Sequence, residues 1–275
     1  MFTFALSKSY LRWLLQRFYS LTAKEEILIV KNILISQPHP GGKKTVYDSL
    51  TQKHGVTVDF HPFIEVVGMP ARELRKQKLR ILDHTAIIFN SRNAIDHFFR
   101  IVEEMKVEIP ATMKYFCTNE GVSIYIQKYT QLRKRKMFVG KGTESSFLEL
   151  LKKHKTLDYL FPCSNIRTET IPNYMEEMNI KFTEAIMYNT VNSDLSGLAS
   201  VYYDILVFFS PQGIASLYAN FPDFVQENKA IAGWGKTTNA ALEEAGLVNT
   251  IYAPTPEHPS MVAALEAYIV AKKKS

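Results

Sequence analysis

The segment ILVFFSPQGIASLY, residues Ile205–Tyr218, decides the fold, because an earlier segment, AIIFNSRNAIDHFF at Ala86–Phe99, repeats its pattern. Each begins with an apolar run typical of a buried strand and continues with helical spacing. A serine separates the two parts, Ser91 in the earlier segment and Ser210 in the later one. A strand followed by a helix is the building unit of parallel α/β sheets. The echo therefore predicts two α/β lobes of similar construction.

The same alternation of strand-like and helix-like segments runs from Lys31 to near the end of the chain. The strand candidates are residues 32–36, 56–63, 86–89, 114–117, 136–139, 159–161, 181–190, 205–209, 230–233 and 250–252. The helix candidates are residues 93–105, 145–154, 171–178, 213–218, 238–245 and 259–271. So many strands suit two doubly wound parallel sheets of about five strands each. A (β/α)₈ barrel of about 250 residues is the competing architecture.

Two extended runs are longer than the other strand candidates and favour two lobes over a barrel. They are Val56–Val67 and Lys181–Val191. A chain that crosses from one lobe to the other and back would need two such runs. We therefore expect these segments to be the crossings.

The bulk composition narrows the class of protein without choosing a function. The chain has 275 residues, of which 33 are lysine or arginine and 27 aspartate or glutamate, a net charge of +6 that suits an anionic partner. The two cysteines, Cys117 and Cys163, lie far apart without metal-ligand spacing, which indicates a reduced, intracellular protein. No apolar run approaches the ~18 residues of a membrane span.

The N-terminal segment stands apart from this pattern. Residues 1–23 contain no acidic residue, and Leu11, Leu14, Leu15 and Phe18 share one helical face. An organellar transit peptide, an interfacial helix, a helix packed on the body and a simple extension all remain open.

The common catalytic signatures are missing from the sequence. It contains no GxSxG, HExxH, Walker A or GxGxxG motif, and its histidines are isolated from one another. The sequence therefore indicates no nucleophile, no metal and no nucleotide cofactor.

The strongest local signal is AIAGWGKTTNAALEEAG, residues Ala230–Gly246. A short strand leads through Gly235 into a helix that begins near Thr237 and Thr238. Exposed N–H groups at such a helix start bind carboxylate or phosphate. An ordinary capped helix without a ligand explains the segment equally well. The same two interpretations apply to Ser91 and Ser210, whose hydroxyls can cap the helix that follows each of them.

A resemblance to a known family links these pieces. Seven segments resemble the uroporphyrinogen-III synthase family in order and spacing over residues 31–271. They are Ile33–Pro38, Phe89–Ile95, Phe161–Asn165, Met187–Val191, Phe208–Gly213, Gly235–Thr238 and Ala253–Thr255. Three features depart from the family pattern: Gln37 replaces a common arginine, Lys236 a frequent proline, and Thr118–Gly121 a Gly-x-x-Thr turn.

The resemblance implies an α/β fold of two doubly wound parallel-sheet lobes joined by a two-stranded antiparallel linker. Lobe 1 is expected to comprise residues 29–62 and 191–275, and lobe 2, inserted between the two crossing strands, residues 63–190. Residues 1–28 are expected to be an N-terminal extension, helical or disordered.

The resemblance also implies an activity. A uroporphyrinogen-III synthase is a lyase that closes the linear tetrapyrrole hydroxymethylbilane with loss of water, inverting its D ring through a spiro intermediate. It uses no cofactor and no metal. We expect a cytoplasmic monomer that serves porphyrin or haem biosynthesis, with a transient hand-over from hydroxymethylbilane synthase, no nucleic acid partner and no membrane span.

The site residues follow from the same resemblance. Tyr188 is expected to face the cleft as the catalytic proton or hydrogen-bond donor, although a packing role for this tyrosine remains open. The residues expected to bind substrate carboxylates are Ser91, Ser164, Ser210, Gly213, Gly235, Lys236, Thr237 and Thr238.

Two other functions remain open at this point. The first is a non-catalytic, bilobed binding protein for an anionic ligand, or a degenerate relative that has lost activity. The second is nucleic-acid binding, for which Tyr125–Arg135 gives only a faint mixture of aromatic and basic residues.

Overall fold

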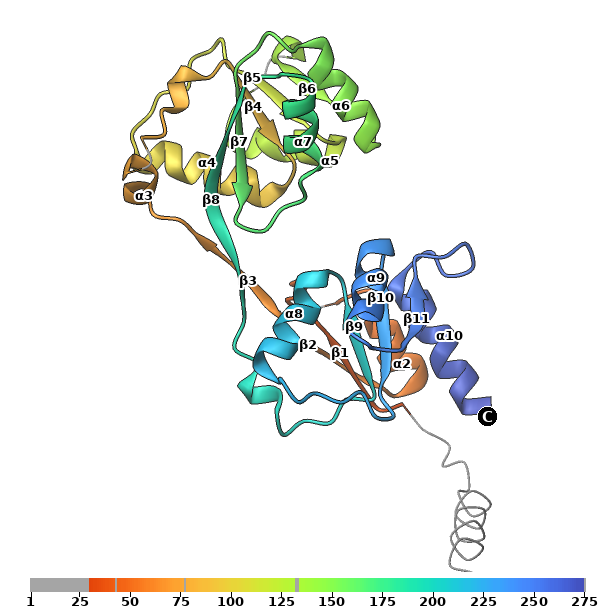
Figure 1. Ribbon diagram of the computed structural model, residues 1–275. Helices are drawn as coiled ribbons and strands as arrows, with labels where there is room; N and C mark the ends of the chain where they lie inside the picture. The colour runs from red at the N-terminus through yellow and green to blue at the C-terminus, as the bar shows by residue number, and fades with distance from the viewer. Residues whose placement is uncertain (1–29, 43, 77, 132–133, 275) are drawn as a thin grey trace, which may run out of the picture. The chain divides into compact units, whose positions relative to one another are not determined.

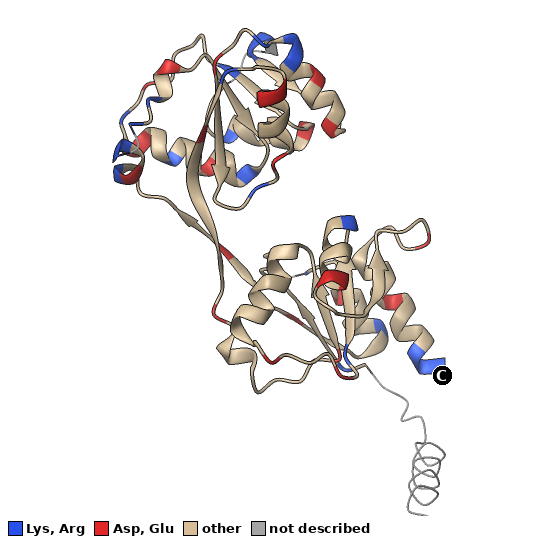
Figure 2. Ribbon diagram, viewed as in Figure 1, with Lys and Arg blue, Asp and Glu red and all other residues tan. Residues whose placement is uncertain are grey.

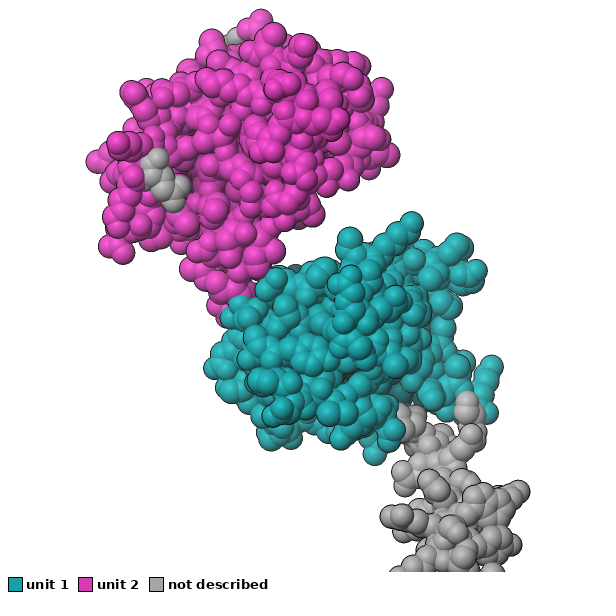
Figure 3. Space-filling model, viewed as in Figure 1, with its two compact units in different colours: residues 1–64, 192–275 teal, residues 65–191 magenta. Residues whose placement is uncertain are grey.

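A computed structural model describes residues 30–274 except 43, 77, 132 and 133. The expected N-terminal extension, residues 1–28, lies outside the described residues. The chain divides into two compact units, coloured separately in Figure 3. Unit 1 comprises the residues up to Ile64 and those from Asn192 onward, and unit 2 is Glu65–Val191.

Unit 1 is built on a parallel five-stranded sheet in the order β11–β10–β9–β1–β2 (Figure 1). Its strands are β1 (Asn32–Ile35), β2 (Thr57–Phe60), β9 (Ile205–Phe208), β10 (Ala230–Trp234) and β11 (Asn249–Ala253). Counted along the chain, this order is 2-1-3-4-5, a common doubly wound arrangement.

Alternate residues of β1 enter different cores, because successive side chains of a strand point to opposite faces. Ile33 and Ile35 pack in the core that also holds side chains of α2 and α10, and Leu34 packs with side chains of α8 and α9. Helices therefore cover both faces. Their bounds are α2 (Asp48–His54), α8 (Pro211–Asn220), α9 (Lys236–Glu244) and α10 (Met261–Lys274).

Unit 2 contains a six-stranded sheet in the order β3–β8–β7–β4–β5–β6. The strands are β3 (Ile64–Gly68), β4 (Ala86–Phe89), β5 (Lys114–Cys117), β6 (Met137–Val139), β7 (Tyr159–Ser164) and β8 (Phe182–Asn192). Strands β4 to β8 are parallel. Counted from β4, their order is 3-2-1-4-5, the first five strands of the dinucleotide-binding order 3-2-1-4-5-6.

Helices also cover both faces of this second sheet. Those that pack on one face are α3 (Ala71–Lys76), α4 (Arg92–Glu104) and α5 (Glu120–Tyr125). Those that pack on the other face are α6 (Glu144–Lys153) and α7 (Thr170–Glu177). Single 3₁₀ turns occur in the connections, at Ile81–Asp83, Ile126–Lys128, Lys134–Lys136 and, in unit 1, Ser196–Leu198.

Strands β3 and β8 form an antiparallel pair. The backbone N–H of Ser193 donates to Phe63 O at 3.0 Å, and the N–H of Met69 donates to Met187 O at 2.9 Å. Residue numbers rise along one strand of the pair and fall along the other, so the two strands run in opposite directions. The predicted fold class, two doubly wound parallel sheets with a two-stranded antiparallel linker, is confirmed, and the barrel alternative is excluded.

The structure differs from the sequence prediction in one long run and three short helices. The run 56–63, predicted as one strand, ends at Phe60, because Pro62 has no N–H to continue the ladder. Helices α2, α3 and α5 were not predicted. Each has only six or seven residues, too few to show a helical period.

Charged residues gather on the helices and loops, as Figure 2 shows, while strands β1, β4, β7, β9 and β10 carry none. The central strands of both sheets are therefore apolar. Among the described residues, none of the helices has the length and apolar character needed to cross a bilayer.

Candidate functional site

Each sheet has one topological switch point, where neighbouring strands continue in opposite directions across the sheet. In unit 2 it lies between β4 and β7, and in unit 1 between β1 and β9. Ligands of doubly wound proteins bind at the carboxyl ends of the strands at this point. Serines follow or end all four strands: Ser91 and Ser164 in unit 2, Ser36 and Ser210 in unit 1.

Ser91 caps helix α4 and contacts a tyrosine hydroxyl. Its backbone is extended, with φ −154° and ψ 162°, and its Oγ accepts a hydrogen bond from the N–H of Ala94 at 3.1 Å. The same Oγ lies 3.3 Å from Tyr188 Oη. The capping interpretation of this serine is thus confirmed, and its hydroxyl also meets that of Tyr188 at the switch point. Its binding of a carboxylate stays a prediction.

Tyr188 is supplied by β8, opposite Ser164, where the pairing with β7 shifts register after Cys163. Its side chain is buried, with 6% exposed, and its ring stacks on His97 with centroids 4.9 Å apart and planes 18° apart. Burial raises the pKa of Tyr188, and the hydrogen bond with Ser91 only partly offsets this rise. The phenol is therefore protonated at neutral pH and can donate.

Ser164 belongs to a small polar cluster at the end of β7. Its Oγ donates to Asn165 Oδ1 at 2.9 Å and lies 3.0 Å from Thr190 Oγ1. Asn165 Oδ1 also accepts from the N–H of Thr190 at 2.7 Å. Ser164 is buried and Asn165 exposed, so the amide presents this cluster to solvent. The sequence prediction missed Asn165 and Thr190.

Ser210 and Gly213 lie together with Ser36 at the switch point of unit 1. Ser210 Oγ accepts from the N–H of Gly213 at 3.3 Å. A Cβ added to Gly213 would lie 3.8 Å from both Ser210 Oγ and Ser36 Oγ. The N–H of Gly213 is thus already engaged, and the two hydroxyls are the groups that can meet a ligand. Ser36 was missed, although it directly follows the apolar run of β1.

Helix α9 begins without a side-chain cap. Its N-cap is Gly235, at φ 82° and ψ 160°, a conformation that favours glycine. Lys236 and Thr237 are exposed, and Thr238 is buried with 1% exposed. The first N–H groups of this nine-residue helix can therefore meet an anion beside one lysine and one hydroxyl.

One further polar atom at the end of β4 lacks a partner. Within the described chain, Asn90 Oδ1 is buried without a hydrogen bond. Such an acceptor is costly unless water or a ligand satisfies it. It directly precedes Ser91, and nothing in the local sequence pattern distinguished it.

Neither cysteine is a nucleophile. Burial raises the pKa of Cys117 to about 12 and that of Cys163 to about 11, so both are thiols at neutral pH. In the part of the chain that the structure describes, no three His, Cys, Asp or Glu side chains are grouped to hold a metal ion. Hydroxyl, amide and backbone N–H groups are what the two switch points offer.

Two doubly wound sheets with such switch points place the chain among the α/β proteins that bind organic ligands at the carboxyl ends of parallel strands. The match to known families is more specific. The family model described as Uroporphyrinogen-III synthase HemD matches residues 46–263, and the chain belongs to this family. Its function is therefore that of a uroporphyrinogen-III synthase, in porphyrin biosynthesis.

Solved structures share the fold at low sequence identity. A mutant uroporphyrinogen III synthase from the extremely thermophilic bacterium Thermus thermophilus is 15% identical with a TM-score of 0.58, covering 89% of this chain and 100% of its own. A uroporphyrinogen-III synthetase from Helicobacter pylori is 18% identical with a TM-score of 0.59, covering 88% and 99%. No curated protein gave a significant match.

Proposed function

We propose that the chain is a lyase that cyclises hydroxymethylbilane to uroporphyrinogen III, with loss of water and inversion of the D ring through a spiro intermediate. The observation that carries this proposal beyond family membership is the contact between Tyr188 and Ser91 at the switch point of unit 2. This contact supports the proposal because the phenol, protonated at neutral pH, lies beside the N-cap of α4 at the switch point.

Tyr188 assists the departure of the substrate hydroxyl. Hydroxide is a poor leaving group, so a donor at its oxygen lowers the barrier to the azafulvene. Ser91 Oγ already accepts from Ala94, and its own proton can go to Tyr188 Oη. The phenol proton is then free for the substrate. Because burial raises the pKa of Tyr188, the residue acts as a hydrogen-bond donor and weak acid.

The remaining residues hold the substrate by its carboxylates. The start of α9, with Gly235, Lys236 and Thr237, binds one group, and Thr238 supports that helix from within the core. Elsewhere, the proposed carboxylate contacts are the hydroxyls of Ser210 and Ser36 in unit 1 and the Asn165 amide in unit 2. Gly213 orients Ser210 through its N–H, Ser164 and Thr190 orient Asn165, and Ser91 orients Tyr188.

Selectivity for isomer III is a matter of holding one conformation of the substrate. Unassisted closure attacks the unsubstituted carbon and gives isomer I, whereas isomer III requires attack at the substituted carbon. A site that fixes the curled chain favours one attack geometry, an effect worth several kcal/mol in well-oriented reactions, or about 7–11 at the limit. No reactive cofactor is required, and we propose none.

We further propose that the protein works in the cytoplasm as a monomer and receives hydroxymethylbilane from its synthase. The free linear tetrapyrrole closes spontaneously to the wrong isomer, so a short transfer time preserves the substrate. The buried free thiols Cys117 and Cys163 suit a reducing compartment.

The test is a coupled assay. Hydroxymethylbilane is generated in situ by its synthase, this protein is added, and the oxidised uroporphyrin I and III isomers are separated by chromatography. We expect isomer III to dominate, against isomer I in a control without the protein. Isomer I alone, with a protein that is folded by circular dichroism, would sink the proposal and favour a binding protein or an inactive relative.

A further inference from the structure

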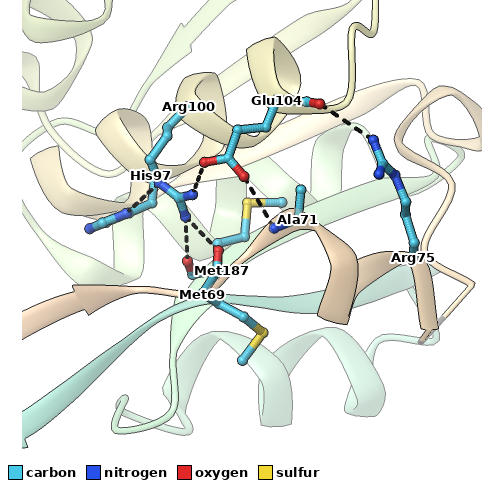
Figure 4. Close-up of polar contacts among 7 residues, drawn as sticks. All are labelled: Met69, Ala71, Arg75, His97, Arg100, Glu104 and Met187. Atoms are coloured by element: carbon cyan, nitrogen blue, oxygen red, sulfur yellow. Dashed lines mark hydrogen bonds and ion pairs between the residues drawn. The ribbon is translucent and has the colours of Figure 1, made fainter.

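Arg100 of helix α4 lies at the centre of a network that reaches the strand bearing Tyr188 (Figure 4). Its Nη2 donates to Met69 O at 2.7 Å and to Met187 O at 3.3 Å. Met187 immediately precedes Tyr188 in β8. The Arg100 guanidinium therefore ties helix α4 to the backbone of Met187, the residue before the proposed proton donor.

The same guanidinium contacts His97 one turn earlier on α4. Arg100 Nε donates to His97 Nδ1 at 3.3 Å, so the imidazole proton resides on Nε2. The ring of His97 stacks on Tyr188. Burial and the Arg100 cation lower the pKa of His97 against a smaller opposing effect of Asp96, so the ring is neutral at pH 7 and can accept this bond.

Glu104 anchors the other side of Arg100. Its carboxylate pairs with Arg100 Nη1 and accepts from the N–H of Ala71 at 3.2 Å, at the start of α3. In Figure 4 the carboxylate lies between Arg100 and Ala71, while Arg75 reaches only the backbone oxygen of Glu104, at 3.3 Å. The guanidinium is thus held by Glu104 as well as by His97 and the two backbone oxygens.

Gly68 makes room for this arrangement. A Cβ at that position would lie 2.9 Å from Arg100 Nη2 and 3.0 Å from His97 Nδ1. Such contacts are tighter than carbon and nitrogen atoms normally make, so any side chain at position 68 would displace Arg100 or His97. The strand that pairs with β8 is therefore shaped to admit them.

We propose that Arg100 and His97 are positioning residues for Tyr188. Arg100 fixes the backbone at Met187, and His97 fixes the plane of the tyrosine ring, so that the phenol keeps one direction toward the substrate. This inference rests on the proposed catalytic role of Tyr188.

The hydrogen bond from Arg100 to β8 is not needed to form the antiparallel β3–β8 pair. Met187 O already accepts from the N–H of Met69, which closes the β3–β8 pair at this place. Arg100 adds a second donor to an oxygen that is already satisfied. What the second bond adds is orientation of the following residue.

The experiment compares Arg100→Gln, His97→Ala and Gly68→Ala with a matched control, Arg75→Gln, in the coupled assay. Arg75 belongs to the same network and carries the same charge, yet ends at the Glu104 backbone. We expect the three test variants to lower kcat by about tenfold with KM within about twofold, as a misplaced catalytic group does. The control is expected to leave both constants unchanged.

Two further measurements separate positioning from a general structural role. In a Tyr188→Phe background, Arg100→Gln is expected to lower kcat by less than about twofold, because the two residues act as one unit. The ¹³Cζ tyrosine signal of Tyr188, assigned by its loss in Tyr188→Phe, is expected to shift in Arg100→Gln and His97→Ala, and not in Arg75→Gln.

The outcomes distinguish this inference from the proposal on which it rests. If Arg100→Gln costs as much in the Tyr188→Phe background as in the wild type, or if the Tyr188 signal does not move, positioning is overturned. If Tyr188→Phe leaves kcat unchanged while the Tyr188 signal does shift in Arg100→Gln, the catalytic role of Tyr188 fails and the physical network stands.

Discussion

The two strand–serine–helix junctions, Ser91 in unit 2 and Ser210 in unit 1, use the same local structure in different surroundings. Their backbones agree within a few degrees, at φ −154° and ψ 162° against φ −157° and ψ 154°. Each Oγ accepts from the N–H three residues later, at 3.1 and 3.3 Å. Ile95 and Ile214, one residue further on, are both buried.

The difference lies in what the rest of each unit brings to the serine. Ser91 meets a tyrosine hydroxyl from β8, whereas Ser210 lies near a glycine of its own helix and the serine that follows β1. The cap is a local property that four residues can encode. Tyr188 and Ser36 are distant in sequence from the serines that they lie near, and we propose that the similar junctions serve proton donation in one unit and ligand binding in the other.

The largest expected effect tests the tyrosine that distinguishes the junctions. Tyr188→Phe removes the donor and leaves the ring, and we expect kcat for isomer III to fall by about 10- to 100-fold. The matched control is Tyr203→Phe in unit 1, whose hydroxyl donates to Asp59 Oδ2 at 3.2 Å. Equal losses in both variants, measured in the coupled assay, would contradict a special role for Tyr188.

The second test compares the serines directly. Ser91→Ala and Ser210→Ala each remove an N-cap, and we expect each to lower the free energy of unfolding by about 1 kcal/mol. Their kinetics should differ: Ser91→Ala lowers kcat through Tyr188, and Ser210→Ala raises KM through a lost carboxylate contact. Urea unfolding and the coupled assay measure the two effects, and identical kinetic changes would erase the distinction.

A third test uses pH and concerns unit 2. Burial lowers the pKa of His97 and, helped by Lys114 and Lys153, that of His154. The unfolded chain takes up protons below its histidine pKa of about 6.5, while the folded chain does not until lower pH. The contribution of these two histidines to the free energy of unfolding is therefore fully present above that pKa and is lost as the pH drops below it.

We expect the free energy of unfolding to fall as the pH drops from 7.5 to 5.5. Urea unfolding of the wild type and of His154→Phe measures it, and the variant should show a smaller loss. Burial opposes the lowering of the pKa of Glu104, but its hydrogen bonds from Arg100 and Ala71 prevail. The contribution of the Glu104 carboxylate to stability changes only nearer pH 4.

A free energy of unfolding of the wild type that does not change between pH 7.5 and 5.5 would refute the assignment of this pH dependence to His97 and His154.

The smallest expected effect concerns the uncapped start of α9 in unit 1. Lys236→Gln removes an exposed charge, and we expect KM to rise about twofold with kcat unchanged, since exposed charges contribute little in salt. Raising the ionic strength should narrow the gap between wild type and variant. A large fall in kcat would show that Lys236 takes part in the chemistry.

Much of the fold was predictable because the relevant signals are local. The apolar runs of β4 and β9 and the serines after them are legible in short windows, and both caps are present. Asn165, by contrast, gained significance only through Thr190, and Ser36 only through Gly213. Such pairs are far apart in sequence, and no local period or propensity connects them.

The Arg100 network also depends on contacts between residues far apart in sequence, which a local pattern does not predict. Arg100 and Met187 are separated by 87 positions, and Gly68 is significant only because two side chains of α4 occupy the space beside it. A sequence pattern assigns an arginine on a helix to solvent by default. The backbone oxygens to which Arg100 donates, those of Met69 and Met187, come together only when β3 pairs with β8.

The insertion of one unit within the other sets an order for biosynthesis. Unit 2 is continuous from Glu65 to Val191, so all of its strands are synthesised before β9 is translated. Strand β1 pairs with β9 through Ile33 and Ile205, and one edge of β1 must wait unpaired for that partner. Exposed apolar strand edges aggregate. A nascent chain of this protein is therefore most prone to aggregate after unit 2 has been synthesised and before β9 pairs with β1.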